Sequence, residues 1–165
     1  MTGSGSMNSL KSGSFTATFE EIKSVLTGTK CTGLSDETGG DVTVKGTFHI
    51  RDYKSGTELK TASIFLLAPV HFSCGETLVV IAGCVAAALM PENTLTKTLT
   101  GTIAKTGADN NIITVLNEEN TANELCQLLA KEGANATKLA HLTVSPTING
   151  FKQGGAAVEV LVMRL

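Results

Sequence analysis

The residues best suited to nucleophilic chemistry are His71 and Cys74, in the stretch HFSC. An imidazole beside a thiol can deprotonate it, and the thiolate then attacks an electrophilic substrate. In a β-strand, however, residues three apart point to opposite faces, so these two side chains would not meet. The sequence offers no third residue that would orient the histidine. A cysteine-dependent enzyme is therefore the least favoured function, and we expect no enzymatic activity.

A second group of reactive residues is the loop SDETGGD, where Asp36, Glu37 and Asp41 could offer oxygen atoms to calcium. Calcium loops place their oxygen ligands more densely, as in DxDxDG, so a solvated turn is the favoured interpretation. His49 and His141 stand apart from other metal-binding residue types and are expected to be ordinary histidines. We expect neither a metal nor a cofactor.

Acidic residues open a segment that has the local signals of a helix. Thr121 and Glu124 have capping-box spacing, and Gly133 provides a stop signal. The sequence predicts a helix here, with Leu125, Leu128 and Leu129 on its apolar face and Glu118, Glu119 and Glu124 at its positive end. A shorter helix is predicted over residues 19–26, although SFTATF also alternates like a strand.

The elements that must position these residues are mostly strands. The 165 residues include 23 threonines and 17 glycines but only six Phe, one Tyr and no Trp. Threonine is β-branched, fits a pleated surface and resists helix formation. Short alternating segments separated by turn signals predict seven or eight strands. The expected fold class is mainly β: an antiparallel β-sandwich or barrel-like domain with one or two short α-helices.

Individual strands can be placed from their alternation. Residues 41–50 read as a half-buried strand with a bulge at Gly46. The next strand is expected to end at Pro69, and the run over residues 75–89 is expected to change conformation near Gly83. The apolar run Leu78–Met90 is too short to span a bilayer, which needs about 20 residues.

Cys31, Cys74, Cys84 and Cys126 have no CxxC spacing, which argues against a zinc knuckle or a thioredoxin-like motif. The N-terminus is polar, with no apolar stretch typical of a signal peptide. The sequence therefore favours four free thiols in a reducing compartment, and a disulfide between some of them is the alternative. The expected location is the virion if the protein is viral, and otherwise the cytoplasm.

Threonine occupies every even position of residues 94–103. Such a face is uncharged and lacks the Lys and Glu that protect exposed strands, so it suits contact with another subunit. A Thr-rich soluble strand without partners is the alternative. The interface candidates are Thr94, Thr96, Thr98, Thr100 and Thr102, with Val158, Val160 and Val162 of the valine-rich C-terminal strand. Asp52 and Tyr53 are candidates for a binding loop near the turn RDYKSGTEL.

Residues 1–14 are rich in Gly, Ser and polar residues and are expected to form a flexible or extended arm, followed by a single β-rich domain over residues 15–165. GSGS before Met7 is typical both of a native arm and of an artificial linker. An ordered arm would lie against a neighbouring subunit.

The net charge of −2 and the scattered basic residues argue against nucleic-acid binding, and no membrane partner is expected. In its Thr, Gly and Ala content, its few aromatics and its polar arm, the chain resembles small viral or phage virion components, such as capsid decoration or cement proteins and tail or fibre domains. The resemblance implies a non-enzymatic assembly protein, a homo-oligomer (trimer or larger) or a component of a larger protein shell. A receptor- or glycan-binding β-sandwich module is the alternative.

Overall fold

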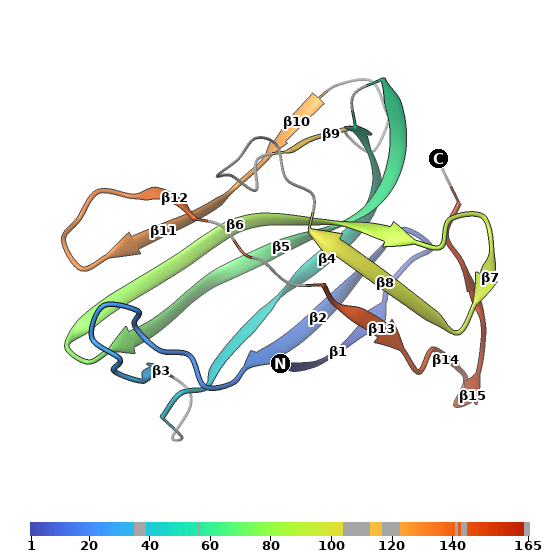
Figure 1. Ribbon diagram of the computed structural model, residues 1–165. Helices are drawn as coiled ribbons and strands as arrows, with labels where there is room; N and C mark the ends of the chain where they lie inside the picture. The colour runs from blue at the N-terminus through green and yellow to red at the C-terminus, as the bar shows by residue number, and fades with distance from the viewer. Residues whose placement is uncertain are drawn as a thin grey trace.

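Antiparallel strands dominate the computed structural model (Figure 1), which confirms the expected mainly β class. The structure describes residues 1–34, 39–55, 57–103, 113–116, 123–140, 142 and 145–163. Twelve strands join one large sheet, and two small two-stranded sheets accompany it in this described part. The sheet follows an open path through β1 (Thr2–Met7), β2 (Ser12–Phe19), β4 (Val42–Ser55), β5 (Glu58–Cys74), β6 (Thr77–Met90), β11 (Leu128–Glu132) and β12 (Lys138–Ala140).

Shorter strands branch from the three long central strands. β3 (Cys31–Gly33) pairs with the end of β5, and β8 (Thr98–Ile103) joins β6 to β13 (Thr147–Asn149). β9 (Ile113–Leu116) pairs with β10 (Asn123–Cys126) and meets β4 at a single residue pair. The small sheets pair β14 (Lys152–Gln153) with β15 (Ala156–Ala157), and β7 (Leu95–Thr96) with β16 (Val160–Leu161).

Both faces of the large sheet carry apolar clusters, because side chains alternate along each long strand. The face that bears Val44, Phe65 and Val85 is called face A, and the face that bears Tyr53, Ile64 and Ala86 is called face B. Three clusters lie along face A, and the strands around β13 and β16 cover its far end. On face B, one cluster joins the central strands to residues of β9 and β10.

The two predicted helices are wrong, since the described residues of both segments are strands or turns. Residues 19–26 hold the end of β2, a bridge between Lys23 and Lys30, and a turn. Most of the segment predicted from Thr121 to Gly133 forms β10 and β11. Long-range pairing of β11 with β6 and β12 replaced the local preference for helix. Thr121, Glu118 and Glu119 lie outside the described residues.

The central strands run further than their sequence signals predict. β5 continues past Pro69 to Cys74, because the register shift between Leu67 and Val70 accommodates a residue without an N–H. The irregularity therefore lies here and not at Gly46, which is paired on both sides. β6 passes through Gly83 without ending. A Cβ at Gly83 would clash with the Gln127 carbonyl oxygen, which accepts the Cys84 N–H, so glycine permits the close approach of β11.

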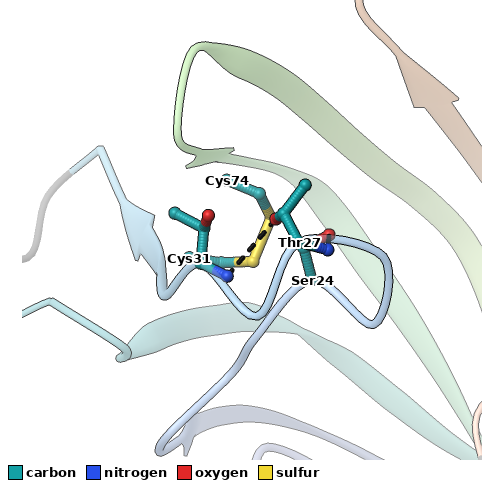
Figure 2. Close-up of a disulfide and its surroundings, with 5 residues drawn as sticks. Ser24, Thr27, Cys31 and Cys74 are labelled. Atoms are coloured by element: carbon teal, nitrogen blue, oxygen red, sulfur yellow. Dashed lines mark hydrogen bonds between the residues drawn. A yellow bond between two sulfur atoms is a disulfide. The ribbon is translucent and has the colours of Figure 1, made fainter.

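All four cysteines form disulfides, so the expectation of free thiols is wrong. Cys31 and Cys74 stand directly opposite each other in the pairing of β3 with β5. Figure 2 shows this bond beside the turn that carries Ser24 and Thr27. Cys84 of β6 is joined to Cys126 of β10. Strand pairing brings together cysteines that are far apart in the sequence, and spacing rules such as CxxC cannot detect this.

Residues 1–14 form β1, the following turn and the start of β2, and they pair within their own chain. All six residues of β1 are exposed, and β1 is the edge of the large sheet. The segment that the sequence marks as an extended arm is thus an edge hairpin in this structure.

Candidate binding surface

Hydroxyl side chains form a regular array on face B where β1, β2 and β4 lie side by side. The strand register aligns Thr2 with Thr18 and Thr18 with Thr43, and the next rows follow the same order. Neighbouring rows along a strand are about 6.6 Å apart, since they are separated by two residues. The array, called here the hydroxyl face, consists of Thr2, Ser4, Ser6, Ser14, Thr16, Thr18, Thr43 and Thr47, with Lys45 among them.

Two contacts within the hydroxyl face join neighbouring strands. The Ser6 and Ser14 hydroxyl oxygens are 3.1 Å apart, and the Thr18 and Thr43 hydroxyl oxygens are also 3.1 Å apart. A shallow, open groove of about 460 Å³ crosses the same strands. Its lining residues are Ser4, Gly5, Ser6, Ser14, Phe15, Thr16, Lys45 and Gly46.

This surface is suited to hydrogen bonding. Each hydroxyl can donate one hydrogen bond and accept others, so the array can adapt to a polar partner. Beside it, β1 presents the unpaired backbone groups of a sheet edge, and such an edge can add a strand from another chain. The edge and the hydroxyl face meet at β1 and form one continuous contact area.

The threonines of residues 94–103 do not share one strand: Thr94 precedes β7, Thr96 lies in β7, and the other three lie in β8. Thr98, Thr100 and Thr102 lie on the exposed face of β8, with Leu99 and Gly101 buried between them. Several hydroxyls in this stretch bond to nearby backbone: Thr94 donates to the Glu92 carbonyl oxygen, Thr96 to that of Thr98, and Thr100 to that of Met90. β8 is an interior strand between β6 and β13, so it offers no open backbone edge.

Two of the three C-terminal valines pack into an apolar cluster. Val162 is 8% exposed and belongs to a cluster with Leu89 and Leu99, and Val160 packs against that cluster. Val158 is half-buried and donates its backbone N–H to the Phe151 carbonyl oxygen at 3.0 Å. These valines therefore stabilise the chain itself, and Val162 is not available on the surface.

Asp52 and Tyr53 lie inside β4 and not on a loop. Asp52 is 0% exposed and accepts a hydrogen bond from the Thr61 hydroxyl at 3.3 Å, while its Oδ2 has no hydrogen-bond partner among the described residues. Tyr53 is 8% exposed and lies in the cluster of face B. Burial, and secondarily the negative charge of Glu92, raise the pKa of Tyr53. A glycan-binding loop built on Asp52 and Tyr53 is not supported by these positions.

The residues proposed for nucleophilic or metal chemistry do not form a reactive site in the described part of the chain. Cys74 is in a disulfide and is not a free nucleophile in this state. Glu124 forms an ion pair with Arg51 at 2.5 Å, which ties β10 to β4. No group of three or more potential metal ligands occurs in the described part of the chain. His141, Asp36 and Glu37 lie outside that part.

The hydroxyl face was missed because its signal is divided among three segments. Alternating Ser and Thr occur in TGSGSM, in SGSFTATF and in VTVKGTF, and each run is short. Only the pairing of the three strands assembles them into one surface. The run at 94–103 gives a stronger local signal because five threonines alternate within one segment.

Comparisons with protein families, with curated proteins and with solved structures found no match. No helix in the described segments is long and apolar enough to cross a membrane.

Proposed function

We propose that this chain is a non-enzymatic structural domain that assembles with copies of itself through the edge strand β1 and the adjoining hydroxyl face. The observation that carries the proposal is the character of β1. It is a six-residue edge strand in which every residue is exposed, without proline or charged side chains. Monomeric proteins normally protect such an edge with lysine, proline or a cover, because an open edge pairs with other chains.

The hydroxyl face supports the same role. It extends the contact from the edge onto β2 and β4, with one charged residue, Lys45, among eight hydroxyl-bearing residues. An antiparallel meeting of two β1 strands would make a two-fold interface in which the same surface is used twice. Larger assemblies, including the virion shells or fibres that the composition resembles, would need a further contact.

Two disulfides support a working place in an oxidising environment, such as a virion surface or the outside of a cell. An oxidising location is therefore proposed in place of the cytoplasm.

The test is the solution mass of three proteins by light scattering. The natural chain is expected to form a discrete oligomer. Ser4→Lys combined with Ser6→Lys adds two charges to β1, and this variant is expected to be a monomer with an unchanged unfolding transition. Thr98→Lys combined with Thr102→Lys adds the same charge to the exposed face of β8 and is expected to keep the oligomer.

Two outcomes contradict the proposal. A natural chain that stays monomeric at high concentration would exclude self-assembly. An oligomer that survives the β1 lysines but is lost with the β8 lysines would move the contact to the threonines of β8.

A further inference from the structure

A second exposed feature lies at the opposite end of β2 from the β1–β2 turn. A narrow hairpin begins at Ile22 and ends at Cys31, and its tip is the turn Ser24–Gly28. Val25 is 100% exposed and Leu26 is 96% exposed. In Figure 1 this hairpin lies beside the turn between β5 and β6. A Cβ at Gly75 of that turn would lie 3.7 Å from Thr29 Cγ2, directly after the tip.

The hairpin is held in a fixed shape. Ser24 donates its backbone N–H to the Thr29 carbonyl oxygen at 2.9 Å, and Gly28 donates to the Ser24 carbonyl oxygen at 2.8 Å. The hydroxyls of Ser24 and Thr27 accept the N–H groups of Thr27 and Thr29. At the base, the Cys31–Cys74 disulfide fastens the hairpin to β5 (Figure 2). The two apolar side chains therefore project from an ordered support.

Two features of this hairpin are unfavourable in water. Large apolar side chains lose the hydrophobic stabilisation of burial when they are fully exposed. Lys23 and Lys30 are exposed and stand directly opposite each other, and like charges in this arrangement repel. One partner would relieve both costs: a surface that is apolar in its interior and carries negative charge at its border.

We propose that the Val25–Leu26 tip inserts into the surface of an anionic lipid bilayer, with Lys23 and Lys30 against the phosphate groups. Peripheral segments bind at a membrane interface by burying apolar side chains while nearby lysines contact anionic headgroups. Several N–H groups of the turn are bonded within the hairpin, which favours entry because unsatisfied backbone groups are costly in lipid. A protein pocket fits less well, because Leu and Val are under-represented among the residues that dominate protein interfaces.

This mode differs from the membrane spans that the sequence argues against, because only one turn enters the bilayer. It is also independent of the proposed assembly, since a monomer carries the whole tip. Copies joined in an oligomer would bind a vesicle more strongly through several tips at once.

The test is co-sedimentation of the disulfide-bonded protein with vesicles. Vesicles of phosphatidylcholine alone are compared with vesicles that also contain phosphatidylserine. The natural chain is expected to bind the mixed vesicles more strongly. Val25→Ser combined with Leu26→Ser is expected to weaken binding by roughly tenfold or more. Lys23→Thr combined with Lys30→Thr is expected to remove the preference for phosphatidylserine.

The matched control is Leu10→Ser. Leu10 is 95% exposed at the β1–β2 turn and is followed by Lys11, so it places an exposed apolar side chain next to a lysine at the other end of β2. Vesicle binding of this variant is expected to be unchanged. The proposal fails if the natural chain ignores both vesicles, or if Leu10→Ser weakens binding as much as the tip variant. It also fails if the tip variant alters the solution mass without altering vesicle binding, because the tip would then be a contact between copies.

Discussion

The two disulfides close loops of nearly equal length but hold different kinds of structure. Their cysteines are separated by 43 and 42 residues in the sequence. Cys31–Cys74 joins two residues that already face each other in a ladder, and the pairs Thr32–Ser73 and Gly33–Phe72 continue that ladder. Cys84–Cys126 joins the sheet to the β9–β10 hairpin on face B. That hairpin meets β4 at the single pair Tyr53–Val115.

This comparison separates two effects of a disulfide. Restriction of the unfolded chain depends on loop length and is therefore almost equal for both bonds, at about 4 kcal/mol. What each bond holds in the folded chain is different. One bond reinforces a ladder that supports the Val25–Leu26 hairpin, and the other keeps an apolar cluster covered.

The largest change in the free energy of unfolding should come from removing one disulfide at a time. Cys31→Ala with Cys74→Ala is expected to lower the free energy of unfolding by about 4 kcal/mol. Cys84→Ala with Cys126→Ala should lower it by roughly 1.5–3 kcal/mol more, the amount for exposing one side chain the size of Val115. Urea titration of both variants measures the difference. Equal losses would mean that the β9–β10 hairpin stays on face B without its bond.

The second largest change in stability concerns Asp52, a buried polar side chain of β4 at the end of the sheet that carries the β9–β10 hairpin. Asp52→Asn is expected to raise the free energy of unfolding by about 1–2 kcal/mol, because it removes a carboxylate whose Oδ2 has no partner in the described structure. Thr61→Val should have the opposite sign, since Asp52 then loses its one hydroxyl donor. Thermal unfolding of both variants at neutral pH tests the pair. A destabilised Asp52→Asn would show that the carboxylate is compensated.

Ionisation of Tyr53 is expected to cause a smaller loss in the free energy of unfolding, confined to alkaline pH. Burial and then Glu92 raise its pKa in the folded chain, so the folded state holds the phenol proton more tightly than the unfolded state does. Stability is therefore complete below the ordinary tyrosine pKa of about 10 and falls as the pH rises through the higher folded value. Urea titrations at successive pH values measure this slope. Tyr53→Phe should flatten it, and an unchanged slope would assign the alkaline loss to other groups.

The smallest effect should come from the ion pair that assists the second disulfide. Glu124→Gln removes the charge that faces Arg51, and its side chain is half exposed. The expected loss is about 0.2–1 kcal/mol and should decrease in high salt. In the variant without Cys84–Cys126 the same substitution should cost more, because fewer contacts then hold the hairpin. A purely additive double variant would show that the bond and the ion pair act independently.

The sequence predicted the fold class because alternation is local. Val42 and Val44 are buried while their polar neighbours are more exposed, as the period of two requires. Turn chemistry also placed the tip between β4 and β5. The helix from Thr121 to Gly133 failed because the partners of β11 lie about 50 residues earlier in β6, beyond any local window.

The hydroxyl face and the Val25–Leu26 tip were less predictable from the sequence than the fold class. The disulfide pairs and the hydroxyl face depend on strand order, which short alternating runs do not specify. A helix over residues 19–26 would place Val25 and Leu26 on one apolar face with Phe19 and Ile22, so that prediction implied burial, whereas both side chains are exposed at a turn. Asp52 was assigned to a loop because its neighbours are turn-forming residues, whereas β4 extends to Ser55.

The position of Cys31 has a mechanical consequence. A pulling force on Met1 would detach β1 from β2 and then β2 from β4 one residue pair at a time, since each strand becomes the edge when its neighbour leaves. The process would stop at Cys31, where the bond to Cys74 fixes the chain to a central strand. Residues 1–30 could thus extend by roughly 100 Å while the rest of the sheet stays folded. If copies join through β1, each junction would act as an extensible tether of defined maximum length.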